Sequence, residues 1–101
     1  MTFNEKCYDL LKKIPKGRIS TYKEIGIALN TKAYRAVGNA MANNPNPIIV
    51  PCHRVVKSDG SIGRYSYKDG IATKIDLLKK EGVSIKKGKV VKFKDTIYKF
   101  D

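Results

Sequence analysis

The sequence Ile48-Ile49-Val50-Pro51-Cys52-His53-Arg54-Val55-Val56 places the only histidine of the chain directly after one of its two cysteines, between two apolar runs. The apolar flanks predict that this segment is buried. A cysteine between apolar runs is usually an inert core residue, whereas a cysteine beside a histidine is typical of a thiolate and its base. Adjacent side chains of an extended segment point to opposite faces, so Cys52 and His53 can meet only if the chain turns there. Pro51 and the asparagine loop before it favour such a turn.

The length of 101 residues corresponds to a single domain, and a hydrophobic fraction of 42% is sufficient for one buried core. We expect one domain over residues 1–101, with a core over residues 3–82 and a loose basic tail over residues 83–101. The sequence shows no internal repeat and no low-complexity segment, which argues against a repeat protein or a disordered chain.

Positive charge dominates the composition, because 21 lysine and arginine residues oppose 9 acidic residues and give a formal net charge of +12. Such a field attracts polyanions, so nucleic acid is the first candidate partner and an anionic membrane surface the second. A lysine-rich surface that is merely solvated is the alternative. Both interpretations remain open for the lysines that concentrate near the C-terminus, which are Lys86, Lys87, Lys89, Lys92 and Lys94.

Neither a membrane-spanning run nor a signal peptide is evident. The longest apolar run is only a few residues long, far below the roughly 20 residues that cross a bilayer. Cys7 and Cys52 lie far apart, and with no secretory pattern we expect both to be reduced thiols in the cytoplasm. Two cysteines and one histidine are too few for a structural zinc site without carboxylates, so no metal is expected.

Two amphipathic helices are predicted at either end of the core. Residues 3–14 carry apolar side chains at helical spacing, with Cys7 on the apolar face as a core thiol. Residues 71–81 form the second helix, which ends with Glu81 in its last turn, where a carboxylate opposes the helix dipole, and with a C-capping Gly82. In this helix Ile71, Ile75, Leu77 and Leu78 are expected to face inward, and Lys74, Lys79 and Lys80 outward.

Two short helices joined by a tight turn are predicted between residues 20 and 42. Ser20 or Thr21 caps the first, and Glu24 lies at capping-box spacing from Thr21. The second covers residues 32–42, is rich in alanine, and carries near its N-terminus three side chains that suit a recognition helix: Lys32, Tyr34 and Arg35. This arrangement is a helix-turn-helix. Many helical hairpins bind no DNA, but the charge of this chain favours DNA.

Loops and short strands complete the predicted fold. The Asn-Pro-Asn-Pro run at residues 44–47 predicts a stiff loop, and residues 57–60 predict a turn. Residues 61–70 form a polar, aromatic loop beside the reactive centre, and residues 83–100 form a short strand or hairpin. The fold class is therefore mainly α with short β elements, a winged helix-like domain that contains a DNA-binding helix-turn-helix.

Three motifs together resemble the O6-alkylguanine-DNA alkyltransferases, also called methylated-DNA–protein-cysteine methyltransferases. They are Pro51-Cys52-His53-Arg54-Val55, Arg35-Ala36-Val37-Gly38 and Asn44-Pro45-Asn46-Pro47. The resemblance covers residues 3–82 and corresponds to the catalytic, C-terminal domain of that family. It implies direct-reversal DNA repair, in which the alkyl group of O6-alkylguanine in DNA is transferred irreversibly to Cys52. The implied enzyme acts once per molecule and needs no cofactor.

For the chemistry, the resemblance implies five residues. Cys52 accepts the alkyl group, with His53 and Glu81 as its activating relay. Tyr22 hydrogen-bonds the base and assists its departure. Asn44 orders the turn that holds the reactive cysteine.

For binding, the resemblance implies that the helix-turn-helix enters the minor groove and that Arg35 fills the gap left by a flipped nucleotide. Met41 forms a pocket wall, and the main chain of Val55, with that of the cysteine, holds the exocyclic amine. Tyr65 and Ser66 lie at O6. The implied partner is double-stranded DNA that carries O6-alkylguanine, bound by a cytoplasmic monomer that does not contact a membrane.

The chemistry of these residues agrees with the implied roles. Attack on an alkyl carbon needs a soft nucleophile, and a free thiol with a pKa of about 8.5 is mostly protonated at neutral pH. His53 can accept this proton directly or through a water, and Glu81 would stabilise the imidazolium. A tyrosine hydroxyl suits the departing base, and a long planar cation such as Arg35 suits the gap in the base stack.

Two features depart from the family pattern. Many members carry a further domain before the catalytic one, whereas we expect this chain to begin at the catalytic domain. The binding loop usually reads Gly-Tyr-Ser-Gly-Gly, but here it reads Arg64-Tyr65-Ser66-Tyr67-Lys68-Asp69-Gly70, with extra residues before the helix. The longer loop affects the shape of the pocket and the range of alkyl groups.

Two other functions compete with alkyl transfer. Alkyltransferase-like proteins are non-catalytic lesion sensors that bind O6-alkylguanine and commonly carry tryptophan in place of the cysteine. This chain contains no tryptophan and retains Cys52. The third possibility is a basic winged-helix DNA-binding protein with Cys52 in its core, which would leave the Cys-His adjacency and the Asn-Pro loop unexplained.

Overall fold

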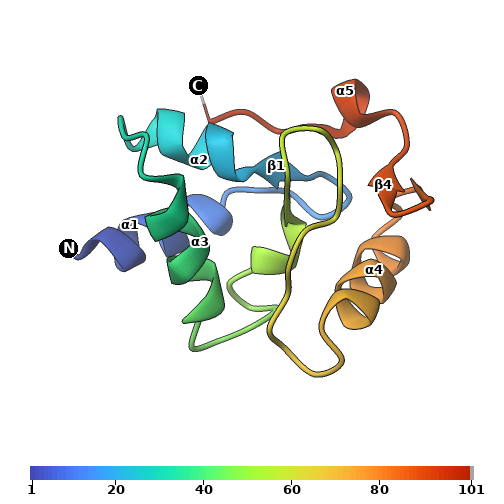
Figure 1. Cartoon of the computed structure of the whole chain (residues 1–101), viewed down its shortest axis with the longest axis horizontal. Coiled ribbons are helices and arrows are strands. Elements are labelled where there is room, and N and C mark those ends of the chain that lie inside the picture. Colours follow the sequence, from blue (N-terminus) through green and yellow to red (C-terminus); the bar gives the residue numbers. More distant parts are fainter. Residues whose placement is uncertain (101) are drawn as a thin grey trace.

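The computed structural model describes residues 1–100 and consists of helices joined by short strands and one long loop (Figure 1). The predicted fold class, mainly α with short β elements, is confirmed. In chain order the elements are α1 Phe3–Leu11, β1 Ser20–Thr21, α2 Tyr22–Ala28, α3 Tyr34–Ala42, the 3₁₀ helix η1 Cys52–Arg54, β2 Val55–Val56, α4 Ile71–Lys80, β3 Ile85–Lys86, β4 Lys89–Val90 and α5 Phe93–Thr96.

Helix α1 begins at a capping box that the sequence analysis missed. The Thr2 hydroxyl accepts a hydrogen bond from the Glu5 main-chain N–H at 3.1 Å, and the Glu5 carboxylate accepts one from the Thr2 N–H at 2.9 Å. Cys7 and Leu11 are fully buried, so the predicted core position of Cys7 is confirmed. The helix ends at Leu11 and not at residue 14, because the N–H groups of Lys13 and Ile14 bond three residues back, to Leu10 and Leu11, before Pro15.

Helices α2 and α3 form the predicted helix-turn-helix. Thr21 caps α2 by accepting a hydrogen bond from the Glu24 N–H at 3.0 Å, as its sequence position predicts. Helix α3 begins at Tyr34, so Lys32 precedes the helix and is not in its first turn, contrary to the prediction. Gly26 lets the two helices approach closely, because a Cβ atom there would lie 2.5 Å from the Tyr34 ring.

Strands β1 and β2 pair in parallel, with Ser20 opposite Val55 and Thr21 opposite Val56. All four residues are buried. Because β1 leads directly into α2 and β2 directly follows η1, this short pairing holds the start of the helix-turn-helix against the Cys-His segment. The structure thus brings together two regions that are more than thirty residues apart in sequence.

Helix α4 is rotated relative to the prediction from its apolar pattern. Lys74, expected to face solvent, is fully buried, and Ile71, expected to face inward, is 51% exposed. The Lys74 ammonium group donates hydrogen bonds to the main-chain carbonyls of Val55 at 2.6 Å and Arg64 at 3.1 Å. These carbonyls are the polar partners that a buried ammonium group needs. Lys74 can therefore occupy an inward-facing position of α4, where an apolar residue is usual.

Residues 83–100 are not a loose tail. Strands β3 and β4 form an antiparallel hairpin, which confirms the predicted hairpin. After α5 the chain returns to β1, where the Ile19 N–H donates to the Thr96 carbonyl at 3.1 Å and the Tyr98 N–H donates to the Ile19 carbonyl at 2.6 Å. The Arg18 guanidinium adds hydrogen bonds to the carbonyls of Thr96 and Ile97. The end of the chain therefore completes the free edge of β1.

The apolar flanks of the Cys-His segment are only partly buried. Val50, Val55 and Val56 lie in the core, but Ile48 is 44% and Ile49 78% exposed, so the predicted burial of the upstream flank is confirmed for Val50 and wrong for the two isoleucines. Ile48 adopts a positive φ of 78°, which is unusual for a β-branched residue and turns the chain before Val50. Within residues 1–100, no helix is both long enough and apolar enough to cross a bilayer.

Candidate functional site

Asn44 holds the loop that delivers the chain to Cys52. Its side-chain amide donates to the Val50 carbonyl at 2.7 Å and to the sulfur of Cys52 at 3.2 Å, and its side-chain oxygen accepts from the Asn46 N–H at 2.9 Å. The Val50 N–H in turn donates to the Asn46 carbonyl at 2.9 Å. Asn44 thereby fixes both the loop and the thiol, so the structure brings it to Cys52.

The 3₁₀ turn of η1 sends consecutive side chains in different directions. The Arg54 N–H bonds to the Pro51 carbonyl at 3.0 Å and closes the turn that was predicted between Cys52 and His53. Cys52 lines a cavity, whereas His53 is fully buried behind it. Within residues 1–100 no hydrogen bond joins the Cys52 sulfur to the His53 ring.

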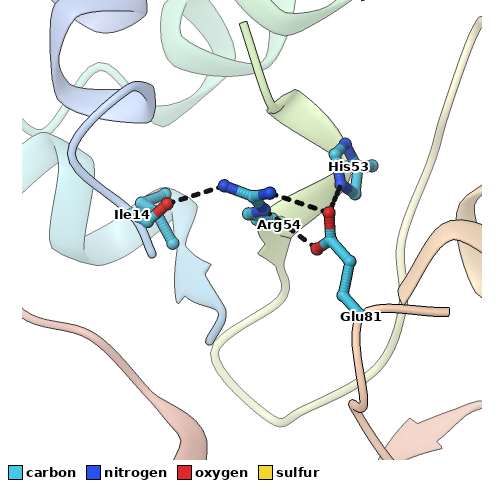
Figure 2. Close-up of polar contacts among 4 residues, drawn as sticks. All are labelled: Ile14, His53, Arg54 and Glu81. Carbon is cyan, nitrogen blue, oxygen red and sulfur yellow. Dashed lines mark hydrogen bonds and ion pairs between the residues drawn. The ribbon is translucent and has the colours of Figure 1, made fainter. Parts of the chain in front are cut away.

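His53 and Glu81 meet although 28 residues separate them in sequence. Figure 2 shows His53 and Arg54 converging on the Glu81 carboxylate, with the His53 Nε2 atom 3.0 Å from Oε2. The Arg54 guanidinium donates from Nε to Oε1 at 2.9 Å and from Nη2 to Oε2 at 2.7 Å. Its Nη1 also donates to the Ile14 carbonyl at 2.8 Å, which connects the group to the end of α1.

Arg54 is a site residue that sequence reasoning missed. Glu81 is the C-cap of α4, where the helix dipole disfavours a negative charge. The bidentate hydrogen bonds from Arg54 compensate for that position and fix the carboxylate in space. The available signal was the arginine directly after the Cys-His pair, whose partner could not be identified without knowing where Glu81 lies.

The protonation of the His53–Glu81 pair follows from its surroundings. Burial lowers the pKa of His53 below its usual value, although the hydrogen bond and the charge of Glu81 raise it. Partial burial raises the pKa of the Glu81 carboxyl, but the hydrogen bonds from Arg54 and His53 outweigh it and the pKa is lowered. At neutral pH the pair therefore consists of a neutral imidazole and a carboxylate.

This protonation state assigns the tautomer of His53. A carboxylate can only accept hydrogen bonds, so the Nε2 atom that faces Glu81 carries the proton. The other ring nitrogen, Nδ1, is buried, makes no hydrogen bond with any of residues 1–100, and has a free lone pair. His53 is thus held as a proton acceptor.

The thiol of Cys52 is protonated at rest. Burial raises the pKa of Cys52, against the hydrogen bond from Asn44 and the positive charge of Lys74, which lower it. Lys74 is the second site residue that the sequence analysis missed. Burial lowers the pKa of Lys74 to about 8, while the proximity of Cys52 raises it. The signal was present, since Lys74 lies four residues before Leu78 on the same stripe of α4.

A cavity of about 700 Å³ lies between α3 and the loop over residues 57–66. Six of the predicted site residues line it: Tyr22, Arg35, Met41, Cys52, Tyr65 and Ser66. Val55 does not line it, because its side chain is fully buried and its carbonyl accepts from Lys74. The structure thus brings all of the predicted binding residues except Val55 to one cavity, and the contact between His53 and Glu81 lies outside its lining.

Tyrosine side chains supply polar groups to this cavity. Burial raises the pKa of Tyr22, and Cys52 raises it further, so its hydroxyl is protonated and can donate. Burial raises the pKa of Tyr65 to about 12. The Tyr65 hydroxyl is buried and has no hydrogen-bond partner among residues 1–100. Both tyrosines therefore line the cavity in their protonated form, although the Tyr65 hydroxyl itself is enclosed by the protein.

A second, smaller cavity of about 200 Å³ lies on another side of Cys52. Asn44, Pro47 and Tyr67 line it, together with residues that it shares with the first cavity. The ring of Tyr67 packs edge-on against that of Tyr65 at a centroid distance of 6.2 Å. The longer loop noted in the sequence therefore contributes a wall beside the thiol. Among residues 1–100, no three His, Cys, Asp or Glu side chains are grouped as metal ligands would be.

Known proteins share this architecture. The family described as "6-O-methylguanine DNA methyltransferase, DNA binding domain" matches residues 2–83. The methylated-DNA–protein-cysteine methyltransferase of Mus musculus is 51% identical over 77 residues, which cover 75% of this chain and 36% of the mouse protein. The chain therefore spans only about a third of the length of that relative.

Two solved structures have similar folds. The Mycobacterium tuberculosis OGT in complex with DNA is 39% identical, with a TM-score of 0.73 over 80% of this chain and 50% of the other. Schizosaccharomyces pombe Atl1, in complex with damaged DNA that contains O6-carboxymethylguanine, is 34% identical, with a TM-score of 0.82 over 96% of this chain and 94% of the other. Together with the match over residues 2–83, these similarities show that the chain belongs to the family of 6-O-methylguanine DNA methyltransferase DNA-binding domains.

Proposed function

We propose that this chain repairs DNA by transferring the alkyl group of O6-alkylguanine to Cys52. The observation that carries the proposal is the position of the thiol. Cys52 lines a cavity large enough for a base, while a neutral histidine held by a carboxylate lies behind it. A sensor that only binds its lesion has no need for a buried acceptor of the thiol proton.

The transfer is a substitution at the alkyl carbon. The sulfur of Cys52 forms a bond to this carbon as the bond from carbon to O6 breaks, and the electron pair of that bond remains on guanine. The thiol proton passes to Nδ1 of His53 through a bridging water, since no direct hydrogen bond joins the two side chains. Guanine takes up one proton, which is balanced by the proton that the His53 imidazolium releases on returning to its neutral form. The product thioether keeps the alkyl group permanently, so no cofactor is required.

Tyr22 and Glu81 lower the cost of the charges that develop during this step. The protonated hydroxyl of Tyr22 donates to the base as it gains negative charge. The Glu81 carboxylate stabilises the imidazolium that His53 becomes. Asn44 holds the sulfur in line, and Tyr65 and Ser66 line the cavity from the loop.

DNA is the proposed partner, bound in the minor groove through α3. The base has to leave the helical stack to reach the cavity, which costs a few kcal/mol. Arg35 is exposed at the start of α3 and lines the mouth of the cavity, so it can occupy the gap in the stack. The DNA complexes of the two similar structures support this partner. We further propose that residues 1–101 act as one monomeric domain in the reducing cytoplasm, where Cys52 stays a free thiol.

The stoichiometry of the reaction tests this function. With excess duplex carrying labelled O6-methylguanine, protein-bound label is expected to rise to one equivalent and stop. Cys52→Ala should accept none, whereas Cys7→Ser should accept as much as the unaltered protein, because Cys7 is fully buried and does not line the cavity. Label on the Cys52→Ala variant would refute the assignment of Cys52.

Lesion sensing without transfer is the second candidate. The observation in its favour is the similarity to Atl1, which extends over 96% of this chain and includes much of the C-terminal segment. In the same assay a sensor would bind the O6-methylguanine duplex more tightly than an undamaged one and would acquire no label.

A further inference from the structure

The hairpin formed by β3 and β4, residues 85–90, carries a concentrated positive charge. Lys86, Lys87 and Lys89 are all exposed, and the sequence from residue 82 to residue 94 contains no acidic side chain. Lys87 and Gly88 form the tip, both with positive φ values, of 53° and 75°. Such a two-residue turn favours Asn or Gly at its first position, so a lysine there presents its charge at the tip despite a local conformational cost.

This basic hairpin is held rigidly against the segment over residues 57–64, here called the wing segment. The Ile62 N–H donates to the Gly88 carbonyl at 3.1 Å, and the Val90 N–H donates to the Gly60 carbonyl at 2.9 Å. Ile62 and Val90 are buried beneath these hydrogen bonds. The lysine side chains take no part in the pairing and form no ion pair among residues 1–100, although the Asp59 carboxylate of the wing segment lies near enough to Lys89 for their charges to interact.

The wing segment in turn forms part of the cavity that holds Cys52. Lys57 and Arg64 line that cavity from the wing segment, opposite Arg35 on α3. Figure 1 shows the loop that begins at the wing segment between α3 (green) and β4 (red-orange). The basic side chains therefore continue from the mouth of the cavity outward onto the hairpin, away from the helix-turn-helix.

We propose that the basic hairpin is a second DNA-binding element, whose lysines contact backbone phosphates beyond the stretch of duplex that α3 covers. The proposal rests on the proposed function, because it requires that DNA lie across the cavity. Phosphate contacts of this kind position a duplex without reading its sequence. Two anchors on either side of the cavity would hold the duplex while one nucleotide leaves the stack between them.

The test compares two variants that each remove three positive charges. Lys86→Gln/Lys87→Gln/Lys89→Gln changes the hairpin, and Lys12→Gln/Lys13→Gln/Lys16→Gln changes exposed lysines beyond the end of α1 as a matched control. Affinity for an undamaged 24-base-pair duplex is measured over a range of salt concentrations. Because each neutralised phosphate contributes about 0.9 to the slope of log K against log salt, the hairpin variant, which removes three lysine contacts, should lose about 2.7 from the magnitude of that slope. The control variant should lose much less.

Alkyl transfer from free O6-benzylguanine base, measured in parallel, separates this proposal from the proposed function. Both triple variants should react with the free base at the unaltered rate, because none of the six lysines lines the cavity. The hairpin proposal would be overturned if the two variants had equal slopes of log K against log salt, or if the hairpin variant kept the slope of the unaltered protein. Neither result would affect the proposed alkyl transfer. If the hairpin variant binds anionic phospholipid vesicles more weakly than the unaltered protein but binds the duplex equally well, the hairpin would be assigned to a membrane surface. That result would also overturn the hairpin proposal. An unaltered protein that accepts no alkyl group would refute the proposed function before the variants are compared.

Discussion

At the scale of single residues, the site depends on a buried histidine that is neutral at rest. His53 can accept the thiol proton only while its imidazole is uncharged. Burial lowers the pKa of His53 below its usual 6.5, so the rate of transfer should stay constant as the pH falls to 6.5 and drop only at lower pH. Stopped-flow measurement of the transfer rate across this pH range gives the pH at which the rate begins to fall, which is the acid limb of the pH–rate profile. A rate that already falls well above pH 6.5 would contradict a neutral, buried base.

Glu81 acts on this reaction through His53, and the pH profile separates its role from that of a purely structural residue. The charge of Glu81 raises the pKa of His53. Glu81→Gln should therefore slow transfer and also move the acid limb to a still lower pH. His53→Ala should slow transfer by about 10²–10⁴-fold, the range typical of general base catalysis. A Glu81→Gln variant that is merely unstable would lose activity without displacing the limb.

Lys74 should make the stability of the fold depend on pH in the alkaline range. In the folded chain burial lowers the pKa of Lys74 from 10.5 to about 8. Between these values the unfolded chain binds the proton and the folded chain does not, so the free energy of unfolding rises with pH there, by up to about 3 kcal/mol. Lys74→Met should remove this rise. Urea titrations of both proteins at pH 8 and pH 10 measure it, and equal pH dependence in the two would contradict the burial of a titrating lysine.

At the scale of elements, the contact between α2 and α3 depends on the absence of a side chain at Gly26. A Cβ atom there would lie 2.5 Å from the Tyr34 ring and 2.9 Å from the Thr31 carbonyl, so the backbone would have to move. Gly26→Ala should destabilise the fold by about 1–3 kcal/mol. Gly38→Ala is the matched control, because no atom lies within 4 Å of the added carbon. In the interior of α3 it should stabilise by about 0.5–1 kcal/mol. Thermal unfolding of the two variants tests whether the free energy of unfolding falls for Gly26→Ala and rises for Gly38→Ala.

The elements that sequence patterns predicted correctly are those specified by local signals. The Thr21 cap, the apolar spacing of α3 and the Asn-Pro loop each act within a few residues, and the helix-turn-helix follows from them. The spacing from Leu78 places Lys74 on the buried stripe of α4, but the carbonyls of Val55 and Arg64 that allow a lysine to be buried there lie outside α4 and cannot be identified from its sequence. The exposure of Ile49 likewise reflects a turn held by the distant side chain of Asn44, and the apolar pattern alone predicted burial.

The same distinction applies to the site. The family motif identified the residues around the first cavity, and the structure brings six of them together there. Arg54 was overlooked because its role is defined by three acceptors from two other parts of the chain. An ion pair between segments far apart in sequence produces no periodic pattern of residues, so it can be identified only from the folded structure.

At the scale of the whole molecule, the C-terminal segment is part of the folded unit. It pairs with both main-chain groups of Ile19, and the Ser20 hydroxyl donates to the Tyr98 carbonyl at 2.9 Å. Removal of residues 96–101 would leave these buried groups unpaired and should destabilise the fold by about 2–4 kcal/mol. Lys94→Gln/Lys99→Gln, which alters two exposed lysines near the C-terminus and none of this pairing, is the control. Guanidinium unfolding compares them, and a truncated chain as stable as the control would mean that the segment contributes little.

The central claim for the whole molecule is that one cysteine, at the wall of one cavity, receives the alkyl group. Peptide mass spectrometry after a single reaction of the unaltered protein with an O6-methylguanine duplex tests it most directly, because Cys7 serves as a control within the same chain. We expect the peptide that contains Cys52 to be heavier by one CH2 unit, because a methyl group replaces the thiol proton, in an amount equal to the guanine restored. The Cys7 peptide should be unchanged. A methylated Cys7, or a tightly bound duplex with both cysteine peptides unmodified, would contradict the account.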